Sequence, residues 1–190
     1  MTVRDQGGIV SCGARLLGAL DALERKGKAL AALVDGRSLD QLARAPGPDE
    51  WSVAQVFLHL AIAEEMAAAY IARKRGFGGA RRATVLSALR FRALRLAFVL
   101  PIKFKAPKGL GELPRIGFEA AHDRWERAGR ALQELLLSVP EREVGLELFK
   151  HPAAGKLDLV QGVRSMTIHF DRHTKQVKRI LQQVQRQASP

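Results

Sequence analysis

The chain has 190 residues, of which 47% are hydrophobic and 26% charged. This composition excludes a disordered or collagen-like protein, and the length predicts one domain covering residues 1–190. The longest stretch without a formally charged residue, 51–63, is shorter than the roughly 20 residues that a membrane-spanning helix needs. The first residues lack the basic region and apolar run of a signal peptide, so we expect a cytoplasmic protein.

The positive charge is concentrated in one segment. The chain carries 31 Lys and Arg against 19 Asp and Glu, which gives a net charge of +12. Residues 66–111 contain eleven of the cations and no acidic residue, so the rest of the chain is close to neutral. This distribution argues against a protein wrapped in nucleic acid, and the basic segment contains no recognised nucleic-acid-binding motif. We therefore expect no specific nucleic-acid partner.

Two helices are predicted in the first half of the chain by apolar residues spaced three and four apart. The first covers residues 16–34 and ends at Gly36. The second begins at Ser52, whose hydroxyl is placed to cap the amide of Gln55 while the Gln55 side chain reaches back. This second helix continues to the charged residues at 73–75.

Two more helices are predicted in the second half. Apolar residues repeat at three and four from position 118 to 139, before Pro140 stops the helix. The last helix starts at Asp158, a good cap, and runs to about Gln187. No segment shows a strand period that competes with these four helices.

Four amphipathic helices of this length predict an all-α four-helix bundle, with a larger helical array as the alternative. The connections between them are unequal. The connection between the second and third helices, residues 76–114, is long enough for a crossover and predicts a partly helical insertion over residues 84–100.

Three histidines lie where the pattern places core residues. His169 and His173 are four apart in the last helix, so their rings lie on one side, and His59 lies beside the apolar stripe of the second helix. Three buried imidazoles each need a partner, at about 1–3 kcal/mol for each unsatisfied group, and one shared ion satisfies all three. Cys12 is the only cysteine, so a metal must be held by His, Asp or Glu. We predict a divalent ion, zinc or nickel, at His59, His169 and His173. Three separate core histidines are the alternative.

The same segments resemble a known family. The sequence WSVAQV at 51–56, with LHL at 58–60 and EE at 64–65, is similar to the second helix of the DinB-like (YfiT-like) superfamily. The sequence HFDRH at 169–173, preceded by HP at 151–152, is similar to its last helix and the loop before it. The resemblance extends over essentially the whole chain. It implies a bundle with an up-down-down-up course and a divalent ion bound by the three histidines.

What the resemblance implies for activity is broader than what it implies for the site. Some members of this superfamily resemble metal-dependent transferases or isomerases that use a low-molecular-weight thiol, and others resemble hydrolases. A small-molecule substrate is therefore expected, with such a thiol as a second reactant. A non-catalytic, metal-stabilised binding protein is the alternative, and the residue that transfers protons is not identified by the sequence.

Other polar residues near these motifs receive more ordinary interpretations. A zinc protease of the HExxH type is disfavoured, because Phe170 stands where the catalytic Glu would be and Asp171 points away from the histidines. Ser165 and Gln176, one turn either side of the pair, are expected to contact the ligands. The remaining candidates are expected to be unexceptional: a surface His122, surface ion pairs at Glu64 and Glu65, and an inert Cys12. His151 is expected to be a solvated loop histidine, with a position at the mouth of the metal site as the alternative.

The basic segment also carries apolar residues, which leaves two roles open. We expect its helix to pack over the bundle or in a homodimer interface, since eight large apolar residues exceed what an exposed helix normally shows. Peripheral contact of residues 81–108 with an anionic membrane is the alternative.

Overall fold

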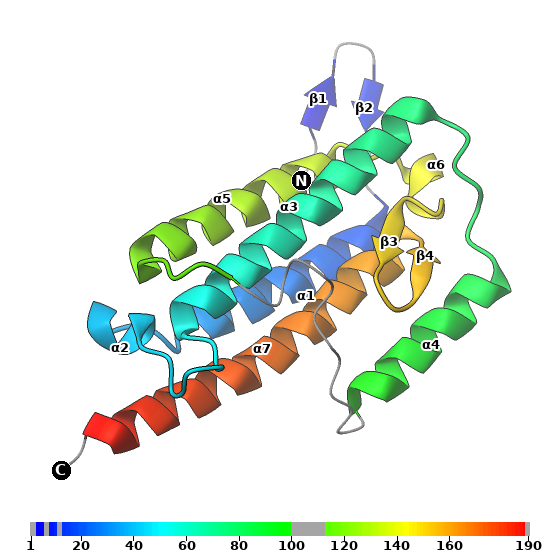
Figure 1. Cartoon of the computed structure of the whole chain (residues 1–190). Coiled ribbons are helices and arrows are strands. Elements are labelled where there is room, and N and C mark those ends of the chain that lie inside the picture. The colour runs from blue at the N-terminus through cyan, green and yellow to red at the C-terminus, as the bar shows by residue number, and fades with distance from the viewer. Residues whose placement is uncertain (1–2, 6–7, 11–12, 100–112, 189–190) are drawn as a thin grey trace.

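The computed structural model describes residues 3–5, 8–10, 13–99 and 113–188. Four long helices make up most of the molecule (Figure 1). They are α1 (Ala14–Ala31), α3 (Val53–Phe77), α5 (Phe118–Leu137) and α7 (Leu159–Ala188). The predicted all-α bundle is confirmed. No helix in the described part of the chain is long and apolar enough to cross a membrane.

The four long helices form two packed pairs, α3 with α5 and α1 with α7. Figure 1 shows α3 and α5 running in one direction while α1 and α7 run in the other, which is an up-down-down-up course. Because α3 and α5 are parallel, the chain must return along the bundle between them. The long connection expected from the sequence provides this return.

Local capping explains where two of the long helices begin. The Ser52 Oγ accepts a hydrogen bond from the Gln55 amide at 3.2 Å, and the Gln55 Oε1 accepts one from the Ser52 amide at 3.0 Å. Asp158 and Gln161 repeat this arrangement before α7, at 2.8 and 3.3 Å. Both starts were predicted, because a capping box depends only on residues that are close in the sequence.

The core lies between the two helix pairs. Gly27 on α1 lets Trp125 and Phe170 approach closely, since a Cβ there would lie 3.5 Å from the Trp125 ring and 3.6 Å from the Phe170 ring. Large side chains that are almost fully enclosed fill the remaining space. They include Leu16, Leu30, Phe57, Leu58, Leu60, Leu132, Leu136 and Leu159.

The structure adds short elements that the sequence did not predict. They are β1 (Val3–Asp5), β2 (Gly8–Val10), α2 (Leu39–Ala43), α6 (Glu141–Val144), β3 (Phe149–His151) and β4 (Gly155–Leu157). The strands form two antiparallel hairpins, β1–β2 and β3–β4. The sequence shows no strand period at these positions, because three-residue strands are too short to produce one.

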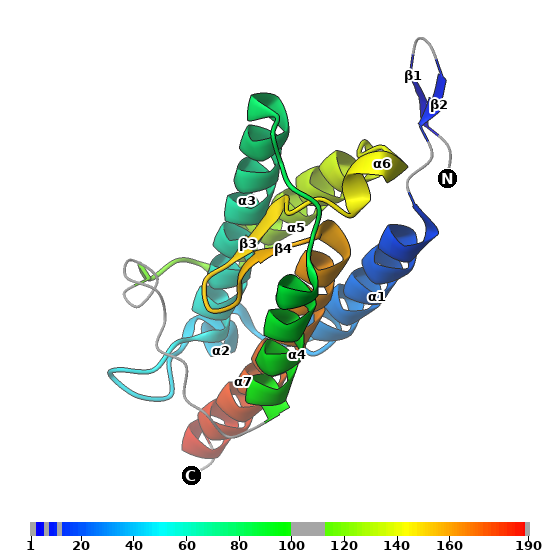
Figure 2. The ribbon, with the colours of Figure 1, turned by 90° about the vertical axis from the view of Figure 1, so that its right-hand side faces the viewer.

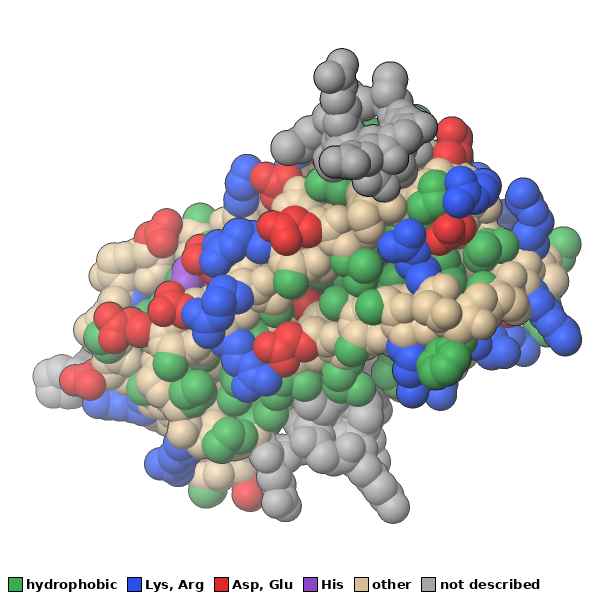
Figure 3. All heavy atoms as spheres, turned by 90° about the horizontal axis from the view of Figure 1, so that it is seen from above, with side chains coloured by type: hydrophobic (Ala, Val, Ile, Leu, Met, Phe, Trp, Pro, Cys, Tyr) green, Lys and Arg blue, Asp and Glu red, His purple; other side chains and the backbone are tan. Residues whose placement is uncertain are grey.

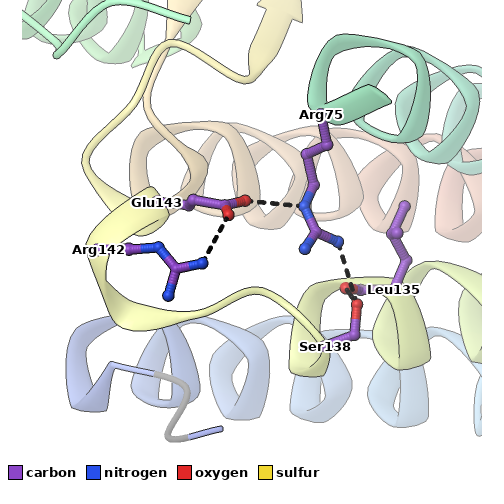
Figure 4. Close-up of polar contacts among 5 residues, drawn as sticks. All are labelled: Arg75, Leu135, Ser138, Arg142 and Glu143. Atoms are coloured by element: carbon purple, nitrogen blue, oxygen red, sulfur yellow. Dashed lines mark hydrogen bonds and ion pairs between the residues drawn. The ribbon is translucent and has the colours of Figure 1, made fainter. Parts of the chain in front are cut away.

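The connection after α3 is anchored by ion pairs (Figure 4). The Arg75 Nε donates to Glu143 Oε2 at 2.9 Å, and its Nη1 donates to the Ser138 Oγ at 3.2 Å. Arg142 lies 3.9 Å from the other Glu143 oxygen. These contacts hold the end of α3 against the segment that joins α5 and α6. In Figure 3, most of the charged side chains on the right-hand part of the surface are Lys and Arg, as the charge distribution in the sequence indicates.

The inserted helix, α4 (Val85–Val99), agrees with the predicted 84–100. It buries Phe91 and Leu94 against the rest of the molecule, so the expected packing over the bundle is present. Four large apolar side chains nevertheless remain more than half exposed: Val85, Leu86, Leu89 and Leu96. Figure 2 shows α4 in front of α7 and beside the β3–β4 hairpin. The rest of the basic segment, residues 100–112, lies outside the described residues.

Candidate metal centre

Three histidine side chains from two helices meet between the two helix pairs. His59 comes from α3, whereas His169 and His173 come from consecutive turns of α7. One ring nitrogen from each lies within 4.8 Å of the others. The His169 Nε2 lies 3.1 Å from the His59 Nε2 and 2.9 Å from the His173 Nε2. The structure therefore brings together the three residues that the sequence singled out.

The donor chemistry of this cluster fits a metal ion. The His169 Nε2 faces two other ring nitrogens, but a neutral imidazole nitrogen has one lone pair or one proton, so it cannot form two good hydrogen bonds. The His173 Nδ1 lies 2.8 Å from the Gln176 Oε1, which can only accept. The Nδ1 of His173 therefore carries the proton, and its Nε2 presents a lone pair to the cluster. Three converging lone pairs are what a divalent ion requires.

Burial keeps the three rings neutral. Desolvation lowers the pKa of His59 to about 4. Desolvation, followed by the charge of His59, lowers the pKa of His173 to about 3. The pKa of His169 is also well below its ordinary value, first through desolvation of the ring and then through repulsion from His173 and His59, although the residue itself keeps partial solvent exposure. Neutral imidazoles bind a metal without first losing a proton, so the cluster is ready for an ion at neutral pH.

Aromatic residues border the cluster. The Trp51 ring lies 5.1 Å from the His59 ring, a contact that the sequence did not indicate. Phe170 is buried and faces Trp125, so it fills the core instead of approaching the histidines. Asp171 pairs with Lys26 at 2.6 Å on the partly exposed side of α7, as its position in the helix predicted. Neither Phe170 nor Asp171 therefore provides this cluster with the carboxylate general base that an HExxH site has.

The residues expected to contact the ligands behave differently from each other. Gln176 contacts His173, as predicted. The expectation for Ser165 is wrong, because its hydroxyl donates to the Gly162 carbonyl at 2.6 Å, within its own helix. Gln55 caps α3 and also donates to the Leu113 carbonyl at 2.8 Å.

The two remaining histidines are less exposed than the sequence suggested. His151 ends β3, and its Nδ1 accepts from the Ala153 and Ala154 amides at 3.1 and 3.2 Å. Burial lowers the pKa of His151. His122 is half-buried among aromatic rings, with the Phe57 ring 5.6 Å away. Neither is the solvated side chain that was expected. The aromatic contact of His122 with Phe57 comes from tertiary packing, whereas the His151 hydrogen bonds form within the turn of its own hairpin. Cys12 lies outside the described residues.

The expectation of a surface ion pair at Glu64 is also wrong. Glu65 pairs with Arg124 at 2.7 Å, as a surface residue should. Glu64 is instead 3% exposed, and its Oε2 has no hydrogen-bond partner among the described residues. Desolvation, and secondly the charge of Glu65, raise the pKa of Glu64 to about 8. The sequence held a signal for this burial, since Glu64 lies seven residues from both Phe57 and Ile71 on the buried face of α3.

Comparison with known proteins agrees with the fold and the motifs. A helical bundle with three histidines facing one another between its helices defines a class of candidate metal-binding bundle proteins. The model of the DinB superfamily matches residues 22–177, and the chain belongs to this superfamily. The chain is also similar to a crystal structure described as "TT2238, a four-helix bundle protein". The two share 20% sequence identity with a TM-score of 0.52, over 86% of this chain and 98% of that chain. No curated protein matches the chain.

Proposed function

We propose that the protein is a metal-dependent enzyme whose divalent ion, zinc or nickel, is held by His59, His169 and His173. The observation that carries the proposal is the convergence of three neutral ring nitrogens within 4.8 Å. A purely structural zinc site is usually closed by a fourth protein ligand. Among the described residues, no further His, Cys, Asp or Glu joins the three in this cluster. The set of three protein ligands therefore favours a site with positions left for water or substrate.

The charge of the ligands favours a particular reaction class. Three neutral imidazoles do not neutralise a divalent ion, which when bound supplies a Lewis acid that lowers the pKa of a coordinated thiol or water. Gln176 orients the His173 ring, and Trp51 and the surrounding core keep bulk water away from His59. Membership of the DinB superfamily supports the same class. We infer a thiol-dependent transfer to a small-molecule substrate, with hydrolysis as the second reaction of this class.

Metal binding is tested on protein purified without nickel resin or chelator. Elemental analysis and calorimetric titration with Zn²⁺ and Ni²⁺ should show about one ion per chain in the wild type. The variant His173→Ala should lose that stoichiometric binding. His122→Ala is the matched control, because it removes a histidine that lies outside the cluster. Equal, substoichiometric metal in the wild type and His173→Ala would overturn the metal site.

Catalysis is tested separately with thiol-transfer and ester or amide hydrolysis assays, each run with and without added metal. Turnover that requires metal and is abolished by His59→Ala supports the enzyme. A fully metallated protein that turns over none of these substrates, but melts at a much higher temperature than the metal-free form, supports the non-catalytic alternative.

A further inference from the structure

A second candidate site lies between α4 and the β3–β4 hairpin, away from the three histidines. The two elements contact each other and enclose an open hollow of about 860 Å³. Figure 1 shows α4 beside this hairpin, and Figure 2 shows the same elements after a turn of 90°. The hollow is lined by Arg90, Lys150 and Lys156, together with one carboxylate, Glu147. Its remaining walls are small or apolar.

The two lysines that line the hollow lie directly opposite each other in the hairpin. In the hairpin register, Lys150 pairs with Lys156, and both side chains are exposed. The opposite face of the hairpin carries Phe149 and Leu157, which are buried. Like charges directly opposite each other on neighbouring strands destabilise a hairpin. A bound anion between the two ammonium groups would remove this repulsion, so the pair has the chemistry of a binding site.

A third cation reaches the same place from α4. The Arg90 guanidinium lies over the hairpin turn, with its Nη1 3.9 Å from where a Cβ on Gly155 would stand. Gly155 adopts a φ of +72°, which an L side chain rarely takes, so the backbone of the turn favours glycine. Among the described residues, none of the ion pairs involves Arg90, Lys150 or Lys156. Three cations therefore surround the hollow without an acidic partner.

The walls and net charge of the hollow indicate the class of ligand. Three cations and the Glu147 carboxylate leave a net charge of about +2, which matches a phosphate monoester. Beside the charged rim, Leu94 and the alanines of both elements present an apolar surface. We propose that this hollow binds a molecule with a phosphate monoester group and a short apolar chain. Arg90 and the two lysines contact the phosphate, and the apolar walls contact the chain.

The proposal does not depend on the metal centre, so it is tested on metal-free protein. The probe is n-hexyl phosphate, measured by calorimetric titration at low salt, with hexyl glucoside as a neutral probe of the same chain length. We expect saturable binding of hexyl phosphate and none of hexyl glucoside. Arg90→Ala should weaken binding about tenfold or more, since it removes a charge-assisted contact. Arg92→Ala, on the same helix but outside the hollow, should change it less than twofold.

One variant separates loss of binding from loss of folding. Lys150→Glu places an acidic residue opposite Lys156, which should keep or raise the melting temperature. The same change should abolish binding of hexyl phosphate. If hexyl phosphate fails to bind the wild type, or binds Arg90→Ala and Lys150→Glu as tightly as the wild type, the proposal is overturned.

The source of the phosphate is distinguished by a vesicle arm. Vesicles of phosphatidylcholine with and without phosphatidic acid are sedimented with the protein. Pelleting that requires phosphatidic acid, is competed by hexyl phosphate and is lost in Lys150→Glu identifies a lipid headgroup. Binding of hexyl phosphate without such pelleting identifies a free phosphate monoester. Pelleting that persists in Arg90→Ala and Lys150→Glu contradicts the assignment to this hollow.

Discussion

Replacing Glu64 with glutamine should stabilise the protein, and increasingly so as the pH rises. The carboxyl is 3% exposed, with Gly129 leaving room for it on α5, where a Cβ would lie 3.6 Å from Oε2. Because desolvation raises its pKa to about 8, the folded protein keeps a proton that the unfolded chain releases near 4.5. The unfolded chain therefore binds fewer protons between these values, and the free energy of unfolding must fall as the pH rises.

The size of the effect follows from the two pKa values. A difference between about 8 and 4.5 corresponds to roughly 5 kcal/mol at full ionisation, at about 1.36 kcal/mol per pH unit. Roughly 4 kcal/mol of this loss falls between about pH 5 and pH 9. Glutamine has nearly the same shape and no charge, so Glu64→Gln should remove this loss. Urea unfolding followed by circular dichroism at pH 5, 7 and 9 measures it directly.

A neighbouring residue provides the control. Glu65 is partly exposed, and its pKa is lowered, first by its hydrogen bond to Arg124. Glu65→Gln should therefore cost at most about 1 kcal/mol, without an advantage that grows with pH. If the wild type and Glu64→Gln lose stability equally between pH 5 and 9, the reasoning from burial is refuted.

Three further perturbations test the histidine cluster, the hairpin and the inserted helix. In the metal-free protein, the buried His59 alone should cost about 3 kcal/mol of stability as the pH falls from about 6.5 to 4, because the unfolded chain protonates this ring while the folded chain, with a pKa of about 4, does not. The lowered pKa values of His169 and His173 add to this loss. His59→Asn should flatten this acid slope in urea unfolding, and an unchanged slope would contradict the burial of the ring. Gly162→Ala should lower the free energy of unfolding by about 1–3 kcal/mol, because the new Cβ would lie 2.8 Å from the Cβ of Phe149. In a double-mutant cycle, Phe149→Leu should recover part of this loss. Phe91→Ala should lower the free energy of unfolding by about 3–5 kcal/mol and Leu89→Ala by less than about 0.5 kcal/mol, since only Phe91 is buried. Equal melting temperatures of the two variants would show that α4 does not pack as described.

The parts of the fold that could be predicted depend on neighbours in the sequence. The helix starts at Ser52 and Asp158 are capping boxes that span four residues each, and the four core stripes recur every three or four residues. The histidine cluster could be predicted for the same reason. His169 and His173 occupy core positions of one helix, and His59 lies beside the stripe of another, so the position of all three between the helices followed from periodicity.

The parts that could not be predicted depend on contacts between distant segments. Glu64 was interpreted as a member of a surface ion pair, whereas its carboxyl lies against Gly129 on α5, 65 positions away. The orientation of α4 depends in the same way on which of two apolar faces meets the bundle. Phe91 and Leu94 are buried and Leu89 is not, but all three look equivalent in a basic, apolar segment.

The position of the histidines gives the proposed metal a structural consequence as well as a chemical one. The bundle consists of two packed pairs, α3 with α5 and α1 with α7, and α3 meets α7 over a much smaller contact. His59 lies on one side of this contact, and His169 and His173 lie on the other. An ion held by all three would join residues 110 positions apart across this smaller contact. Because closing such a long loop is costly in chain entropy, ion binding and the approach of the two pairs must stabilise each other.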